Sequence, residues 1–311
     1  DEVLVRVRAA SVHPDVWHVV TGIPYILRLM GGGLSKPKSQ VPGTDMAGVV
    51  ESAGKSVSEY RPGDEVFGES LKGFQWANGG AFAEYVAVSQ NALAGKPKGV
   101  TFEQAAAIPT SGIIAHHNLR GLGKVQAGQR VLVNGAGGGV GSITVQLAKA
   151  LGARVTGVDC ARKLDMIRAF GADHVIDYAK EDFTRSGERY DIIVDVASNL
   201  SLAGCKQALT PKGVYVLIGH DHYGAATGHL FGSLPRFFKL MLITPFVDHL
   251  PAVSFAVPDR KEIMPVLQTL LAEGKLTPVI DRSFPLDAAV EAMDYLASGK
   301  ACGKIMITMA A

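Results

Sequence analysis

The chain has 311 residues, 47% of them hydrophobic, which is enough apolar material to fill two hydrophobic cores. Its formal net charge is +2 and its 31 lysines and arginines are scattered, which argues against nucleic acid as a partner. No apolar run reaches the roughly 18 residues of a membrane span, and Cys160, Cys205 and Cys302 form no C-x-x-C pair, so we expect a protein of the reducing cytoplasm without membrane contact.

Residues 1–107 contain short β-type runs separated by glycine and proline. The runs are EVLVRVRA, GTDMAGVVESAG, PGDEVFG and GAFAEYVAV. They predict a compact β-rich domain. Because the chain opens inside the first run and without methionine, we expect further residues before Asp1.

From residue 108 onward, the pattern changes to strands that alternate with helices of about ten residues. The strand-like runs include RVLVNGA, RVTGVD, YDIIVDV and VYVLIG, and the helix-like runs include SITVQLAKALG and ARKLDMIRAFG. This alternation predicts an α/β fold class, with a Rossmann-type doubly wound parallel sheet over residues 108–258.

Residues 221–250 interrupt that alternation with an apolar, lightly basic segment that contains FFKLMLITPF. The segment could line a pocket, cover a neighbouring subunit or touch a membrane surface; we expect a buried connection or a subunit contact. Residues 259–311 then show two amphipathic helices and a last strand, KIMITM. We expect this tail to return and complete the first domain.

A glycine-rich stretch, NGAGGGVG, follows the strand RVLV at residues 134–141. A Rossmann turn needs small residues at three places, which select Ala136 for the tight turn, Gly138 for the approach of the pyrophosphate and Gly141 for helix packing. N–H groups of the next helical turn would bind a phosphate: Gly138, Gly139 and Val140. A phosphate-free turn or a methyl-donor site remains the alternative.

An acidic residue about 20 positions after this turn should bind the adenosine ribose hydroxyls, and Asp159 stands there. An aspartate repels a 2′-phosphate and favours NAD. Arg162 and Lys163 follow within one turn and could pair with that phosphate instead, or form a solvated helix start. The sequence therefore leaves NADH and NADPH both open.

Further motifs give the chain a family resemblance. PGDEVFG (62–68), GGAFAEYV (79–86), AAAIPTSG (105–112), GADHVIDY (171–178) and GK (303–304), with the glycine turn, resemble the medium-chain dehydrogenase/reductase superfamily and its zinc-free quinone oxidoreductase-like branch. The resemblance implies a GroES-like catalytic domain from residues 1–107 and 259–311, a Rossmann domain over 108–258 and an active cleft between them. Such proteins are commonly homodimers that pair through their Rossmann sheets.

The same resemblance carries over several cofactor contacts. It places Tyr178 on the adenosine side and Lys163 on the phosphate side, and it makes Thr110 a candidate for a contact with the nicotinamide ribose. Each has a plain alternative: Tyr178 as strand-end packing and Thr110 as turn chemistry. Four further residues match the family. Ala197 and Ile218-Gly219 match its nicotinamide-side loops, and Lys304 matches its C-terminal lysine, although Lys304 could also be the exposed start of a strand.

Zinc-dependent members of this superfamily carry metal ligands at positions where this chain has His13, Asp45 and the region of Thr110. A catalytic zinc needs three protein ligands, usually His, Cys or carboxylate. His13 and Asp45 do not supply them, so we expect no zinc.

Without zinc, reduction of a conjugated carbonyl suits the site, because hydride addition leaves an enolate or hydroquinone anion that hydrogen-bond donors can stabilise. His13 stands where relatives carry an asparagine; it could donate to the substrate oxygen, or be satisfied by backbone at a turn. Trp17 and Tyr25 could wall the pocket or belong to the core. No tyrosine has a lysine four positions later, which excludes the short-chain dehydrogenase pattern.

The sequence therefore predicts a zinc-independent NAD(P)H-dependent oxidoreductase that acts on a quinone, enone or related conjugated carbonyl, with His13 and Thr110 as its catalytic candidates. The alternative is a low-turnover NAD(P)H-binding redox sensor or interaction protein on the same fold.

Overall fold

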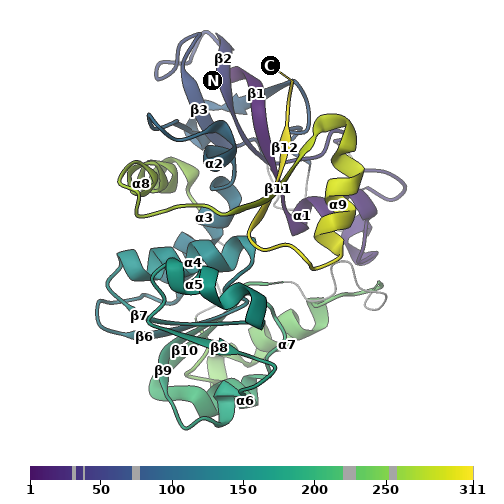
Figure 1. Cartoon of the computed structure of the whole chain (residues 1–311). Helices are drawn as coiled ribbons and strands as arrows, with labels where there is room; N and C mark the ends of the chain where they lie inside the picture. Colours follow the sequence, from purple (N-terminus) through teal and green to yellow (C-terminus); the bar gives the residue numbers. More distant parts are fainter. Residues whose placement is uncertain (30–32, 38, 72–77, 220–228, 252–257, 311) are drawn as a thin grey trace.

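A computed structural model describes residues 1–29, 33–37, 39–71, 78–219, 229–251 and 258–310. Two β-sheets lie at opposite ends of the molecule, with helices α3, α4 and α8 between them (Figure 1). Both chain termini lie at the end that holds the first sheet, drawn at the top of Figure 1.

The first sheet has seven strands in the order β11-β12-β1-β2-β3-β5, with β4 paired to β1. Along β1, Val3, Val5 and Val7 are buried and alternate with more exposed residues, as expected for a strand with one face on a core. The C-terminal strand β12 pairs antiparallel with β1, so the tail of the chain joins the sheet that its start forms. The strands are β1 (Glu2–Val12), β2 (Asp45–Ala53), β3 (Glu65–Glu69), β4 (Tyr85–Ser89), β5 (Leu93–Gly95), β11 (Ile280–Pro285) and β12 (Lys304–Thr308).

The second sheet has five parallel strands in the order β10-β9-β6-β7-β8. The chain starts at the central strand β6, proceeds to β7 and β8 on one side, and then to β9 and β10 on the other. This reversal is the topological switch point beyond which doubly wound sheets bind ligands. The predicted α/β class with a parallel sheet is confirmed. The strands are β6 (Arg130–Asn134), β7 (Arg154–Asp159), β8 (His174–Asp177), β9 (Tyr190–Asp195) and β10 (Leu209–Leu217).

One hydrophobic cluster connects the two sheets. It includes Ile108 before α3, Ile143 on α4, Leu267 on α8 and Met306 on β12, each almost fully buried. The two sheets are therefore held by a shared core. The α-helices are α1 (Pro14–Thr21), α2 (Phe102–Ala106), α3 (Pro109–His116), α4 (Gly139–Ala150), α5 (Leu164–Ala169), α6 (Leu202–Ala208), α7 (Leu234–Ile243), α8 (Arg260–Ala272) and α9 (Ala289–Ala297).

Helix α7 lies in the apolar segment 221–250, of which the structure describes residues 229–250. None of its residues is buried, and Phe237, Phe238 and Leu242 are 48%, 46% and 71% exposed. A buried connection within the chain is therefore wrong for α7, whereas a contact with a second subunit stays a prediction. Among the described residues, no helix has the length and apolar character to cross a membrane.

Candidate functional site

The glycine turn follows β6 and makes its sharpest change of direction at Gly135, whose φ is 81°. A Cβ atom there would lie 3.0 Å from the main-chain nitrogen of Ala197. We expected Ala136 to supply the tight turn, but Ala136 is fully buried and the left-handed conformation belongs to Gly135, one residue earlier.

Gly138 and Gly141 meet very different surroundings. A Cβ on Gly141 would lie 2.0 Å from the carbonyl oxygen of Gly135, so only glycine fits where α4 packs against the turn. A Cβ on Gly138 would have no atom nearer than 3.6 Å. Gly138 is the N-cap of α4, and its own N–H donates to the carbonyl oxygen of Gly135 at 3.2 Å, so this one of the three predicted phosphate donors is already used. No side chain caps the helix, so the N–H groups of Gly139 and Val140, the first two of α4, are available to a phosphate. The turn fits the pyrophosphate of a dinucleotide.

The turns after β6, β9 and β10 meet at one edge of the parallel sheet. The carbonyl oxygen of Asn134 accepts hydrogen bonds from Val196 N (3.0 Å) and Ala197 N (3.2 Å). The carbonyl oxygen of Asp195 in turn accepts from Ile218 N at 3.0 Å and Gly219 N at 3.3 Å. The predicted nicotinamide-side loops therefore lie side by side, next to the glycine turn.

Asp159, at the end of β7, is hydrogen-bonded to the glycine turn. Its Oδ2 accepts a hydrogen bond from Gly137 N at 2.8 Å, and its Oδ1 accepts from Cys160 N at 2.8 Å. Lys163 Nζ lies 3.9 Å from Oδ1, and both side chains are largely buried. A Cβ on Gly137 would come within 2.6 Å of Lys163 Cδ, so the lysine stem covers the turn.

Arg162 and Tyr178 are exposed near Asp159. The Arg162 guanidinium donates to the carbonyl oxygens of Lys300 at 2.8 Å and Gly299 at 3.3 Å. Tyr178 is 61% exposed, and its main-chain N–H donates to the carbonyl oxygen of Asp159 at 3.2 Å. Its ring is therefore not packed at the strand end, and it leaves an aromatic face open beside the turn.

A second group of polar side chains is buried where the first sheet meets α3. Thr110 donates from its N and Oγ1 to Asp45 Oδ1, at 3.0 Å and 2.5 Å. Ser11, opposite Asp45 in the β1–β2 register, donates to Asp45 Oδ2 at 2.8 Å. Glu69 Oε1 lies 2.9 Å from Thr110 Oγ1, and Arg260 pairs with the other oxygen of Glu69. We call these five residues and Lys304 the Thr110 cluster.

Lys304 joins the Thr110 cluster to the glycine turn. It is only 3% exposed, so an exposed strand start is wrong for this residue. Its Nζ donates to Ser111 Oγ at 3.2 Å and lies 3.6 Å from Asp45 Oδ2. Burial lowers the pKa of Lys304 and the charge of Asp45 opposes that shift. Gly303 forms a β-bridge with Gly138, so the same segment contacts the turn.

His13 caps the N-terminus of α1. Its Nδ1 accepts from Asp15 N at 3.3 Å and lies 3.3 Å from Asp15 Oδ2. Its Nε2 is buried and has no hydrogen-bond partner among the residues that the structure describes. One ring nitrogen therefore has a backbone partner at the turn. The other, Nε2, is left for a ligand, because a buried polar atom without a partner in the protein calls for such an explanation.

Trp17 and Tyr25 are not brought together. Trp17 is 8% exposed and belongs to the core of the first sheet. Tyr25 is 44% exposed; its N–H donates to the carbonyl oxygen of His229 at 2.7 Å, and Arg28 lies over its ring at 4.8 Å. Trp17 therefore follows its core alternative, and Tyr25 lies at the contact between residues 23–28 and the segment before α7.

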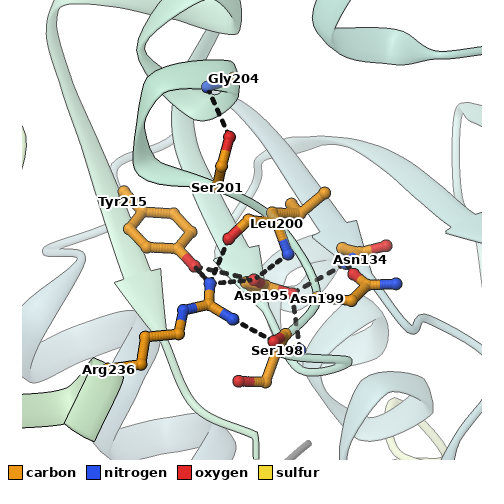
Figure 2. Close-up of polar contacts among 9 residues, drawn as sticks. All are labelled: Asn134, Asp195, Ser198, Asn199, Leu200, Ser201, Gly204, Tyr215 and Arg236. Carbon is orange, nitrogen blue, oxygen red and sulfur yellow. Dashed lines mark hydrogen bonds and ion pairs between the residues drawn. The ribbon is translucent and has the colours of Figure 1, made fainter. Parts of the chain in front are cut away.

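The loop after β9 is fixed by Asp195, which the sequence analysis did not single out (Figure 2). Its carboxylate accepts from Asn134 Nδ2, Ser198 N and Tyr215 Oη, each at 2.8 Å. Arg236, on α7, lies 3.6 Å from Asp195 Oδ2 and donates to the carbonyl oxygens of Ser198 and Leu200. Burial, followed by the charge of Asp195, raises the pKa of Tyr215. The network positions the Ala197 loop and attaches α7 to it.

A doubly wound sheet with an open glycine turn, joined by Lys304 to a polar cluster on a second sheet, defines a two-domain dinucleotide-dependent oxidoreductase. Comparison with known proteins agrees with this class. Residues 1–98 match the family model described as alcohol dehydrogenase GroES-like domain, and residues 170–307 match the one described as zinc-binding dehydrogenase. The chain belongs to the medium-chain dehydrogenase/reductase family, in its quinone oxidoreductase-like branch.

Several relatives cover almost the whole chain. The chain is 32% identical over 316 residues to the 2-methylene-furan-3-one reductase of Solanum lycopersicum. The matched region covers 99% of this chain and 71% of the reductase. It is also 32% identical over 325 residues to the chloroplastic quinone-oxidoreductase homolog of Spinacia oleracea, with 99% and 89% covered. The structure of the quinone oxidoreductase from Coxiella burnetii is 26% identical, with a TM-score of 0.79 and 99% and 90% covered.

Proposed function

We propose that this protein is a zinc-independent NAD(P)H-dependent oxidoreductase that delivers hydride to the conjugated carbon of a quinone or enone. The observation that carries the proposal is Lys304, which connects the phosphate-binding turn to the Thr110 cluster. The relatives support it, since they include proteins named for furanone reduction, for quinone reduction and, in Arabidopsis thaliana, as an NADPH-dependent alkenal/one oxidoreductase.

The nicotinamide cofactor would lie along the carboxyl edge of the parallel sheet. Residues 136–141 would hold its pyrophosphate, Asp159 and Tyr178 its adenosine side, and the Ala197 and Ile218–Gly219 loops its nicotinamide side. When bound, the reduced cofactor would supply the hydride.

The choice between NADH and NADPH turns on how Asp159 and Arg162 are engaged. Asp159 is committed to the turn by two main-chain N–H groups, and Arg162 is exposed but bound to carbonyl oxygens. We therefore propose that NADPH binding requires Arg162 to leave its two carbonyls. Loss of NADPH affinity with retained NADH affinity in Arg162→Ala, measured beside Asp159→Ala, would identify the phosphate partner.

The residues at the zinc positions do not fit a zinc ion. The Asp45 carboxylate already accepts from Ser11 and twice from Thr110, and the Lys304 cation lies 3.6 Å from it. A metal ion there would face a positive charge and lack further ligands. No group of three His, Cys, Asp or Glu side chains that could hold a metal occurs in the described ranges.

The chain's own residues would stabilise the anion that hydride addition leaves on the substrate oxygen. A hydrogen-bond donor aimed at that oxygen is sufficient, because the charge is delocalised. His13 Nε2 is buried, has no hydrogen-bond partner among the described residues and would serve as this donor. His13→Gln keeps a hydrogen-bonding group and His13→Ala removes it, so the glutamine variant should retain more activity.

A panel of quinones and enones, each assayed with NADH and NADPH, tests the proposal. Turnover of about one per second or faster on a conjugated acceptor supports an enzyme. Tight cofactor binding without oxidation by any acceptor would favour the redox sensor or interaction protein instead. The exposed apolar face of α7 is the feature that favours that second function.

The proposed assembly is a homodimer, paired through the edge strand β10 of the parallel sheet. Light scattering of the purified protein would test it. We keep the cytoplasm as the proposed compartment on the basis of the separated cysteines, although relatives are named as chloroplastic and mitochondrial.

A further inference from the structure

Thr110 lies between two carboxyl groups from neighbouring strands. Its Oγ1 is 2.5 Å from Asp45 Oδ1 and 2.9 Å from Glu69 Oε1. A threonine hydroxyl has one proton, so it can donate to only one of these oxygens. If both carboxyl groups were ionised, the other contact would place a hydroxyl lone pair against a carboxylate oxygen. All three side chains are buried, so water cannot relieve that repulsion.

We propose that the cluster holds one additional proton on Glu69 at neutral pH. Glu69 Oε1–H donates this proton to Thr110 Oγ1, and the Thr110 hydroxyl donates its own proton to Asp45 Oδ1. Every hydrogen-bonding contact of the three groups then has one donor and one acceptor.

The surroundings of the two carboxyl groups place the proton on Glu69. Asp45 is stabilised as an anion by donors from Thr110 and Ser11 and by the Lys304 cation. Glu69 faces one cation, Arg260, and the charge of Asp45 disfavours a second anion nearby. Burial, the largest effect, raises the pKa of Glu69; Arg260 opposes this and Asp45 adds to it. A neutral carboxyl group still accepts from Arg260 through its other oxygen.

This arrangement fixes which way the Thr110 hydroxyl can act. It already donates to Asp45 and accepts from Glu69, so it offers a further group only a lone pair. An acceptor suits a ribose hydroxyl of the cofactor and cannot stabilise a substrate anion. The donor to the substrate oxygen is then His13 Nε2. Glu69 is a positioning residue that acts through Thr110, and this consequence rests on the proposed function.

The proton itself can be observed in the protein without cofactor or substrate. The infrared difference spectrum of wild type minus E69Q near neutral pH should show the carbonyl stretch of a protonated carboxylic acid, shifted in heavy water. E51Q, which changes an exposed glutamate, should give no such band. Absence of the band in wild type, or its persistence in E69Q, would overturn the assignment. If E69Q fails to fold, loss of the band on alkaline titration of wild type answers the same question.

Cofactor affinity tests the positioning role. Because its pKa is raised, Glu69 keeps its proton at pH values above the ordinary glutamate pKa. It releases the proton as the pH rises through the raised pKa. Ionisation of Glu69 leaves two buried carboxylates competing for the single Thr110 proton, which should displace the hydroxyl from the position in which it accepts from the ribose. The dissociation constant of wild type for NADPH should therefore rise about tenfold, which corresponds to the loss of one hydrogen bond. In E69Q it should stay constant, because the amide donates to Thr110 at every pH. Equal pH dependence in both proteins would refute the positioning role. The band without NADPH binding would reject only the proposed function.

Discussion

The glycine turn and the Thr110 cluster are built in opposite ways. The turn is one run of eight residues, and its geometry comes from backbone: Gly141 has no room for a methyl group and Gly138 leaves a helix N-terminus open. The cluster is assembled from side chains that are far apart in sequence, since Thr110 is 65 residues from Asp45 and Arg260 is 191 from Glu69. A local motif binds a ligand with main-chain groups, whereas a long-range cluster sets charge and proton positions.

The largest expected effect is at the turn and separates folding from binding. In Gly141→Ala, the new methyl group collides with the backbone of Gly135. We therefore expect the free energy of unfolding to fall by at least ~3 kcal/mol. Gly138→Ala, in open space, should keep the stability of wild type and lose NADPH affinity. Denaturant unfolding and cofactor titration of both variants would check this. Equal stability of the two would contradict the roles assigned to these glycines.

The second effect concerns the link between the two regions. Lys304→Met keeps the stem but leaves the buried Asp45 without its cation, which should cost about 3 kcal/mol of folding free energy. The control is Lys180→Met, because Lys180 is an exposed lysine whose pair with Asp177 contributes little. A thermal-unfolding shift of similar size in both variants would show that Lys304 does not hold the cluster.

Sequence reasoning succeeded where the signal was local. The strand–turn–helix around the glycine run and the parallel sheet follow from spacing within about 30 residues. The cofactor contacts assigned to the turn and to Asp159 stay predictions. Glu69 and Arg260 were missed because no periodicity marks a partner 191 residues away. The tight turn was assigned to Ala136, whereas the positive φ lies at Gly135, because a motif fixes which residues are small and not which one takes the left-handed conformation. The sequence held a weak signal for the Asp195 network. Asp195 is an aspartate at the end of a buried strand, and its partner Arg236 is one arginine in an apolar segment.

A third, smaller effect tests whether Asp195 fixes the nicotinamide-side loop through α7. Arg236→Met removes donors to the carbonyl oxygens of Ser198 and Leu200, and we expect a loss of about 1–2 kcal/mol. Hydrogen exchange should rise in α7 and in residues 196–200 and remain unchanged at the glycine turn. Unchanged exchange in α7 would show that other contacts hold the helix.

The smallest effect is at the exposed edge of the turn. Tyr178→Ala should leave the free energy of unfolding within ~0.5 kcal/mol of wild type, because the ring is 61% exposed. It should weaken NADPH binding several-fold if the ring stacks on the adenine, since such stacking contributes roughly 1 kcal/mol or more. Calorimetric titration would measure it, and unchanged affinity would leave Tyr178 outside the cofactor site.

The most direct test of the proposed reaction is the fate of the hydride. NADPH that carries deuterium at the transferred position of its nicotinamide ring would be oxidised with an enone, and the product analysed by NMR. We predict deuterium on the β-carbon of a saturated ketone. Deuterium on the carbonyl carbon of an alcohol would contradict it.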